Sequence, residues 1–356
     1  MAAVHSLRLE MVTLRHKPLS GACMVELRPP PNGWIILDKP RGLGSTQAVA
    51  AVKRNLREGG YAKTKVGHGG TLDPLAEGVL PIALGEATKL AGRMLDASKV
   101  YDFTIQFGVE TDTLDSEGEV VKRVDRFPPM AAIAAILEHL TGKIEQTPPA
   151  FSALKVGGKR AYDLARAGED VKLKPRTVTI HSLSFAGNPD IGDDLDSAFQ
   201  DSIGRPDPYE VSAPLEKAEA VTLTAHVSKG TYIRSLARDI ARALGTVGHV
   251  TYLRRTKAGP FTEAQAISLD KLNEIANGAQ LDDLTLPLEA GLDDIPALNL
   301  NQTDAQAVRQ GRVLSELPQS SGLYCAMLDS VPVALVEISE GTAKVVRGFN
   351  LPDVAE

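Results

Sequence analysis

The segment YDFTIQF at residues 101–107 alternates apolar and polar side chains without a break. Tyr101, Phe103, Ile105 and Phe107 fall on one face, because successive side chains of a strand point to opposite sides. One apolar and one polar face predict a half-buried strand within a sheet. Tyr101 opens this strand on its apolar face, so the residue pattern alone favours a core aromatic there.

Strands and helices alternate irregularly on both sides of this segment. The apolar spacing predicts helices over 48–56, 131–140 and 233–244, and strands over 34–37, 178–185 and 221–227. This order predicts a mixed α/β (α+β) fold, with a central mixed sheet flanked by helices. Short apolar runs at 324–328, 333–338 and 343–346 predict a small β-rich domain at the C-terminus.

The chain divides into three parts by composition. Residues 1–32 lack a sustained period and are expected to form a flexible extension, in which Met24 is an alternative start of translation. Residues 33–289 are expected to form one large domain, interrupted by an acidic, Gly- and Pro-rich surface insertion at 187–219. Residues 290–356 are expected to form the small C-terminal domain.

Composition excludes several functional classes. The 356 residues contain two cysteines, far apart in the sequence, which argues against a metal pair or a disulfide framework and favours the cytoplasm. No apolar run is long enough to span a bilayer, and the N-terminus has no secretory pattern, so we expect neither membrane insertion nor export. The motifs of P-loop, dinucleotide-binding, serine-hydrolase and zincin sites are absent from the sequence.

Positive charge is concentrated locally although the net charge is −6. Residues 229–257 contain seven basic residues and one acidic residue, and the local field decides where a polyanion docks. On the predicted helix, Arg234, Arg238 and Arg242 recur every four residues opposite the apolar stripe, with Thr231 as the expected N-cap. Either these arginines form a solvated face, or Arg234, in the first turn, is paired with an anion.

The stretch Gly67–Pro74 (GHGGTLDP) has the composition of a site-forming loop. Glycines let a backbone approach another molecule closely, and Asp73 precedes a proline. The alternative is that Asp73 is a helix N-cap with Pro74 at the first helical position. His68 is equally consistent with an ordinary turn. The acidic stretch 112–118 fails the calcium-loop spacing and predicts a hairpin turn.

The residues 67–81 (GHGGTLDPLAEGVLP) and 84–89 (LGEATK) closely resemble the catalytic motif of the bacterial tRNA pseudouridine-55 synthases. Three further blocks agree with it in the same order. They are Leu37–Pro40, residues 151–159 (FSALKVGGK), and Lys229–Arg234 with His249–Arg255. The resemblance therefore spans residues 33 to about 261.

This resemblance implies roles for eight residues. Asp73 corresponds to the catalytic aspartate, and Arg234 to the arginine that holds its carboxylate. Tyr101 matches a tyrosine that stacks on the target base and takes part in proton removal at C5. The remaining positions, which contact the RNA or shape the pocket, are His68, Tyr232, Leu253, Lys39 and Pro40.

The resemblance also implies a pseudouridine synthase fold with a PUA-like C-terminal domain, and isomerisation of one T-loop uridine after base flipping. We expect the tRNA T-stem-loop as partner, no cofactor or metal, no protein partner, and a monomer. Gly69 stands where many bacterial members have Thr, and His-Gly-Gly occurs in the guide-RNA-dependent relatives, so a guide-RNA-dependent pseudouridylase is one alternative. A non-catalytic tRNA chaperone that uses the same basic surface is another.

Overall fold

The structure is a computed structural model that describes residues 27–152, 154–169, 171, 173–187, 217–278 and 281–351. Met24, most of the expected N-terminal extension and most of the acidic insertion lie outside these residues. Within the described part of the chain, no helix is long and apolar enough to cross a membrane.

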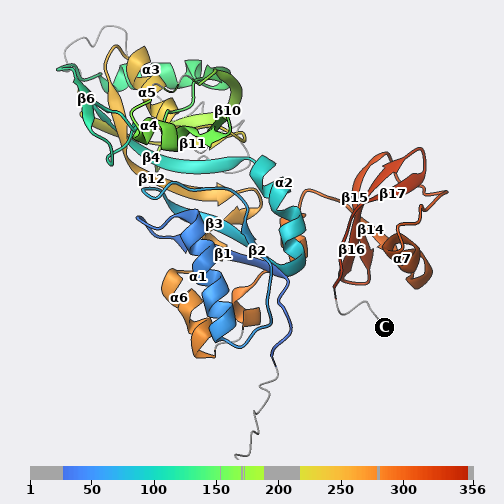
Figure 1. Ribbon diagram of the computed structural model, residues 1–356. Coiled ribbons are helices and arrows are strands. Elements are labelled where there is room, and N and C mark those ends of the chain that lie inside the picture. Colours follow the sequence, from blue (N-terminus) through green and yellow to red (C-terminus); the bar gives the residue numbers. More distant parts are fainter. Residues whose placement is uncertain are drawn as a thin grey trace, which may run out of the picture.

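One large sheet forms the centre of the molecule (Figure 1). Its strands run in the order β1-β3-β12-β4-β11-β10-β7, with β2 paired to β3 and β13 paired to β12. Neighbours are antiparallel except for β12 and β3, so the sheet is mixed as predicted. The strand bounds are β1 (Gly33–Lys39), β2 (Val66–His68), β3 (Glu77–Leu84), β4 (Lys99–Phe107), β7 (Gly142–Gln146), β10 (Arg176–Phe185), β11 (Ala220–Val227), β12 (Gly248–Ala258) and β13 (Phe261–Thr262).

The predicted strand over 101–107 is β4, in the middle of the sheet. Phe103, Ile105 and Phe107 are buried, as the alternation predicts, and they join the main hydrophobic core. Tyr101 lies at the end of this row and is only partly buried. The apolar row of β4 therefore leads from the core to a less covered position at Tyr101.

Helices pack against the large sheet in two groups (Figure 1). Helices α1 and α6 pack together beside β1, whereas α5 packs on β12 and β4 with α3 beside it. The bounds are α1 (Ser45–Glu58), α2 (Ala91–Asp96), α3 (Met130–His139), α4 (Ala161–Arg166), α5 (Ile233–Ala243) and α6 (Leu269–Asn273). The expected helices over 48–56, 131–140 and 233–244 are thus confirmed as α1, α3 and α5.

Two small hairpins extend from the sheet. Strands β5 (Val109–Thr111) and β6 (Val120–Arg123) follow β4 and enclose the acidic stretch 112–118, which confirms the predicted hairpin turn. Strands β8 (Lys155–Val156) and β9 (Lys159–Arg160) precede α4.

The C-terminal part forms a separate sheet to one side of the molecule (Figure 1). Its strands are β14 (Ala297–Leu300), β15 (Gly322–Leu328), β16 (Val331–Ser339) and β17 (Thr342–Gly348), with α7 (Gln302–Arg309) packed against them. The small β-rich domain is confirmed, whereas β14 and α7 were not predicted. Lys89 Nζ donates a hydrogen bond to the carbonyl oxygen of Gly348 at 2.9 Å, which ties this domain to the large one.

Candidate active site

Asp73 lies on the short connection between β2 and β3. Pro74 and Leu75 form a turn, the Ala76 N–H donates to the carbonyl oxygen of Asp73 at 3.1 Å, and β3 follows at once. Among the described residues, no helix begins at the Asp73–Pro74 pair, so the N-cap alternative is wrong. The Asp73 carboxylate is therefore not occupied by a helix terminus.

The Asp73 carboxylate is paired with Arg234 on α5. Oδ2 of Asp73 lies 2.7 Å from Nη2 of Arg234, and 38% of the Asp73 side chain is exposed against 6% for Arg234. A charge-assisted pair of this length orients both groups. The partly exposed carboxylate is thus held by a buried guanidinium, with one side open to an incoming molecule.

Of the two alternatives for the arginines of α5, the solvated face is wrong for Arg234, and its pairing with an anion is confirmed by the contact with Asp73. Its guanidinium points into the protein, where Nη1 donates to the carbonyl oxygen of Thr113 at 2.9 Å and Nη2 to that of Phe151 at 3.0 Å. Arg242, two turns further on, has an exposed side chain. Thr231 is not the N-cap either, because Tyr232 occupies that position and the Thr231 hydroxyl donates to the Ser228 carbonyl.

Asp115 is a second carboxylate on Arg234 that sequence reasoning missed. Its Oδ2 lies 3.1 Å from Nη1 of Arg234, and its side chain is 4% exposed. Its Oδ1 accepts hydrogen bonds from the Thr113 hydroxyl at 2.6 Å and the Glu117 N–H at 3.0 Å. In the sequence, Asp115 is one of several acids in a turn, and no spacing distinguishes it from its neighbours. Asp115 therefore anchors Nη1 of the guanidinium, whereas Nη2 holds Asp73.

A cavity of about 310 Å³ opens over the Asp73–Arg234 pair. Its lining includes residues from four segments that are far apart in the sequence. They are the Gly70–Asp73 loop, β4, the start of α5 and β12. The predicted site residues that line it are Asp73, Tyr101, Tyr232, Arg234 and Leu253. The fold thus gathers five of the eight predicted site residues around one carboxylate.

Lys39 and Pro40 do not line this cavity but support its rim. The Lys39 ammonium is fully buried and donates to the carbonyl oxygens of Leu43 at 2.6 Å, Pro40 at 3.0 Å and Pro74 at 3.4 Å. Burial lowers the pKa of Lys39 to about 8, although Asp73 and Glu77 act in the opposite direction. Lys39 therefore ties the turn after β1 to the residue that follows Asp73.

His68 also lies outside the cavity lining. It ends β2, and its Nδ1 accepts a hydrogen bond from the Gly70 N–H at 3.4 Å. Burial and the positive charge of Arg255 lower the pKa of His68, which favours the neutral imidazole. In this structure His68 contacts the glycine loop that leads to Asp73.

Arg176 is a further cavity residue that the sequence did not single out. Its guanidinium lies over the ring of Tyr232, 4.8 Å from the ring centroid, and Nη2 donates to the carbonyl oxygen of Gly230. A guanidinium over an aromatic face is attracted by the ring quadrupole. Arg176 therefore fixes Tyr232 at the cavity wall and adds positive charge to its mouth.

Lys99 is the second buried lysine near the cavity. Its ammonium donates to the carbonyl oxygens of Ala97 at 2.6 Å, Leu95 at 2.8 Å and Met94 at 2.9 Å. These acceptors belong to the C-terminal end of α2, where carbonyl groups lack helical partners. Burial, reinforced by the charge of Arg255, lowers the pKa of Lys99 to about 8. Lys99 fastens α2 to the strand that carries Tyr101.

The lowered pKa of Lys99 predicts a pH-dependent stability difference from the Lys99→Met variant. Between about pH 8 and 10.5 the unfolded chain binds the proton that the native chain has lost, so raising the pH stabilises the native wild-type protein. From pH 8 to 9.5 the free energy of unfolding of the wild type should rise by up to about 2 kcal/mol relative to the variant. Urea denaturation of both proteins at the two pH values measures this, and a constant difference would contradict it.

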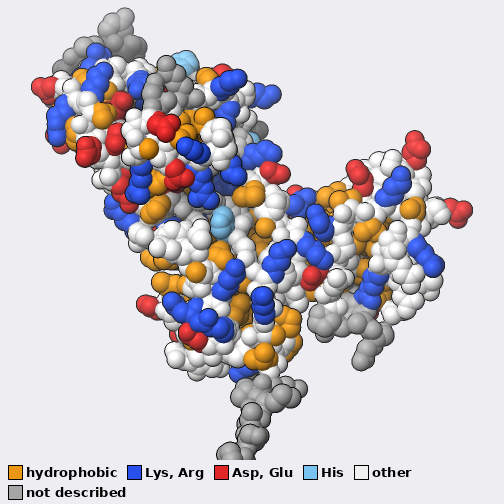
Figure 2. Space-filling view, in the orientation of Figure 1, with side chains coloured by type: hydrophobic (Ala, Val, Ile, Leu, Met, Phe, Trp, Pro, Cys, Tyr) orange, Lys and Arg blue, Asp and Glu red, His pale blue; other side chains and the backbone are white. Residues whose placement is uncertain are grey.

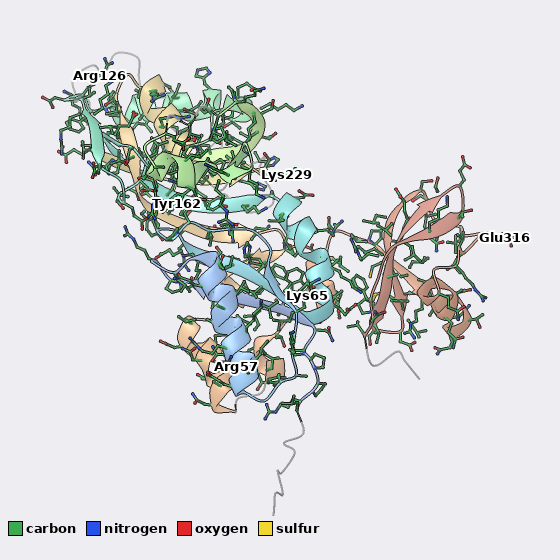
Figure 3. The ribbon with its side chains drawn as sticks, in the orientation of Figure 1. Arg57, Lys65, Arg126, Tyr162, Lys229 and Glu316 are labelled. Atoms are coloured by element: carbon green, nitrogen blue, oxygen red, sulfur yellow. The ribbon has the colours of Figure 1, made fainter. Side chains whose placement is uncertain are left out.

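Basic side chains gather at the mouth of the site. Figure 2 shows Lys and Arg side chains grouped over the middle of the large sheet and beside α2. Lys229, labelled in Figure 3, lies near the end of α2, and its Nζ is 2.9 Å from Oδ1 of Asp96. This pair is largely exposed, so it contributes little to stability and remains accessible to an anionic partner.

The relatives of this chain identify its family. The family models described as "TruB family pseudouridylate synthase (N terminal domain)" and "tRNA pseudouridylate synthase B C-terminal domain" match residues 57–191 and 234–293. The chain is 64% identical to "tRNA pseudouridine synthase B" of Novosphingobium aromaticivorans over 91% of this chain and 99% of the relative. It belongs to the TruB family of pseudouridylate synthases. The TruB-family enzyme of Zymomonas mobilis that carries the same name is 53% identical, over 90% of this chain and 96% of that one.

Two solved structures with a similar fold are structures of multi-subunit complexes. A chain of the structure titled "Crystal Structure of a Cbf5-Nop10-Gar1 Complex" is 26% identical, with a TM-score of 0.62, over 90% of this chain and 86% of that one. A chain of "Structure of H/ACA RNP bound to a substrate RNA containing 2'-deoxyuridine" is 25% identical with the same TM-score, over the same shares. The much higher identity to the TruB enzymes places this chain with them rather than with the subunits of these complexes.

Proposed function

We propose that this protein converts one uridine in the T-loop of tRNA to pseudouridine, at the position that the family resemblance implies, 55. The observation that carries the proposal is the ion pair between Asp73 and Arg234 at a cavity that is walled by Tyr101 and Leu253. The names of the TruB relatives support tRNA as the substrate. We further propose that the protein acts as a cytoplasmic monomer and needs no guide RNA.

The reaction is an isomerisation of the nucleoside. The bond between N1 and C1′ breaks, a bond between C5 and C1′ forms, and a proton leaves C5 while N1 gains one. Three routes use a single carboxylate at the place of Asp73: attack at C1′, addition to C6, or proton abstraction at C2′. In each of them Arg234 keeps the carboxylate oriented towards the cavity.

The target uridine must leave the T-loop stack to reach Asp73. Base flipping costs a few kcal/mol, and stacking on an aromatic ring returns roughly 1–3 kcal/mol per base. Tyr101 and Leu253 line the cavity on β4 and β12, where they can contact the two faces of a flipped uracil. The basic groups at the mouth, Arg176 and Lys229, suit the phosphates of the flanking nucleotides.

The direct test uses the purified full-length protein and an unmodified tRNA transcript without added RNA. We expect one pseudouridine per transcript, at the T-loop uridine, and the same product from an isolated T-stem-loop. Mapping tRNA from cells that lack and then regain the protein should show the same single site. Product at another position, or only in the presence of a guide RNA, would contradict the proposal.

Binding of the T-stem-loop should weaken as salt rises, because Lys and Arg contacts to phosphates release counterions. Filter-binding affinities measured between 50 and 200 mM KCl should give a negative slope of log K against log salt. Arg176→Gln should make this slope shallower by about 1 if Arg176 contacts one phosphate. The largely exposed Arg57 on α1 provides the control, since Arg57→Gln should leave the slope unchanged.

A further inference from the structure

Arg255 is a buried arginine at the inner wall of the cavity, and none of the three routes proposed for Asp73 uses it. Its side chain is 1% exposed, and it belongs to β12, two residues after Leu253 and on the same face. Nε donates to the carbonyl oxygen of Val79 at 2.7 Å and Nη2 to that of Gly70 at 3.2 Å. Nη1 has no hydrogen-bond or ion-pair partner among the described residues. Because Arg255 lines the cavity, the N–H groups of Nη1 are free to donate to a ligand bound there.

Gly70 leaves the space next to Nη1 open. A Cβ atom at this position would lie 3.5 Å from Nη1 of Arg255 and 3.8 Å from Cε of Lys99. The φ angle of Gly70 is +144°, a backbone conformation that side chains disfavour. The glycine therefore keeps a path from the cavity to the unused donor.

The positive charges of Lys99 and Arg255 at the inner wall of the cavity are not paired with a carboxylate among the described residues. All three ammonium protons of Lys99 can be used by backbone carbonyl oxygens, and no described carboxylate lies within ion-pairing distance of Lys99 or Arg255. Arg234, by contrast, is balanced by Asp73 and Asp115. The inner wall of the cavity, formed by Arg255 and Lys99, thus suits a group that is neutral when it binds and becomes negative during the reaction.

The uracil ring is such a group. When the N1–C1′ bond breaks, the electron pair left on N1 is delocalised onto O2 and O4, and addition to C6 places negative charge on O4. We propose that Nη1 of Arg255 donates a hydrogen bond to a carbonyl oxygen of the flipped uracil and stabilises the charge that develops there. This proposal rests on the proposed function, and it makes Arg255 a catalytic residue for any of the three routes of Asp73. Removing one donor of this kind typically lowers kcat by about 10²–10³-fold.

The test combines Arg255→Lys with substrates altered at one atom. T-stem-loops carrying uridine, 2-thiouridine or 4-thiouridine at the target position are compared in single-turnover reactions, and the isomer is measured by chromatography of digested nucleosides. Sulfur is a weaker hydrogen-bond acceptor than oxygen. We expect Arg255→Lys to lower the rate on uridine about 100-fold with little change in affinity. The thio-penalty is the ratio of the rate on uridine to the rate on a thio-substrate, measured with the same protein. For one of the two thio-substrates, this thio-penalty should be smaller in Arg255→Lys than in the wild type, or vanish.

Arg254→Lys is the matched control. Arg254 precedes Arg255 on β12, points to the other side, and is paired with Asp38, Glu77 and Glu263. Its replacement should leave both thio-penalties as they are in the wild type. Gly70→Ala keeps Arg255 but covers Nη1, so it should also lower the rate and reduce the same thio-penalty, and it decides the question if Arg255→Lys does not fold.

Two failures are distinguishable. If the wild type forms no pseudouridine on the uridine substrate, the proposed function fails. If the wild type is active, each thio-penalty in Arg255→Lys and in Gly70→Ala is compared with its value in the wild type. If both thio-penalties are unchanged in both variants, Arg255 acts only through the structure, and the inference is overturned.

Discussion

Replacing Asp73 with Asn is expected to reduce pseudouridine formation by about 10⁴-fold or more, since the amide can neither attack nor accept a proton. The substitution is nearly isosteric and Asp73 is 38% exposed, so the fold should survive. Binding of the T-stem-loop should be retained, because phosphate contacts and stacking supply most of the affinity. Single-turnover assays and filter binding on the same preparation measure both quantities.

Asp96→Asn is the matched control for this experiment. Asp96 lies at the end of α2, is largely exposed and pairs with Lys229, so its loss should change the rate little. Appreciable turnover by Asp73→Asn would remove the assigned role of Asp73. If cells that carry only Asp73→Asn lack the pseudouridine but keep the physiological function of the protein, the tRNA chaperone alternative would instead be favoured.

The parts of the fold predicted from the sequence are those in which one periodicity dominates. Phe103, Ile105 and Phe107 alternate with polar residues, so β4 is evident from the pattern. Strand β3 gives no such signal, because it is buried on both faces and contains Gly78 and Pro81, which are unusual inside a sheet. Pro81 is tolerated there, and its carbonyl oxygen accepts a hydrogen bond from the Gly69 N–H at 2.8 Å.

Sequence reasoning predicted the candidate site residues that belong to a recognisable motif. It missed those that only the tertiary structure brings to the site. Asp73 and Arg234 were identified through the family resemblance, whereas helical spacing left open whether Arg234 lies on a solvated face or is paired with an anion. Only the packing of α5 against β12 and β4 turns its first turn towards Asp73. Asp115 and Arg255 have no local signal, because an acid in a turn and an arginine in a basic run are usually exposed. Their burial follows from contacts between segments distant in the sequence.

Replacing Arg234 with Gln is expected to have the second large effect, on both stability and rate. Asp115, 4% exposed, would become a buried carboxylate without its cation, and breaking a buried pair in this way costs about 3–5 kcal/mol. Asp73 would lose the group that orients it, so the rate should fall by about 10²-fold or more. Urea denaturation and single-turnover assays measure the two effects separately.

Two further variants show which effect belongs to which carboxylate. In Arg234→Gln/Asp115→Asn the uncompensated buried charge is removed, so much of the lost stability should return, whereas the rate should stay low because Asp73 is still unheld. Arg242→Gln, on the same helix but with a largely exposed side chain, should change the free energy of unfolding by no more than about 0.5 kcal/mol. If the double variant regained activity together with stability, Arg234 would serve the fold alone. The orientation of Asp73 would then have to come from the Pro74 turn and from Lys39 behind it.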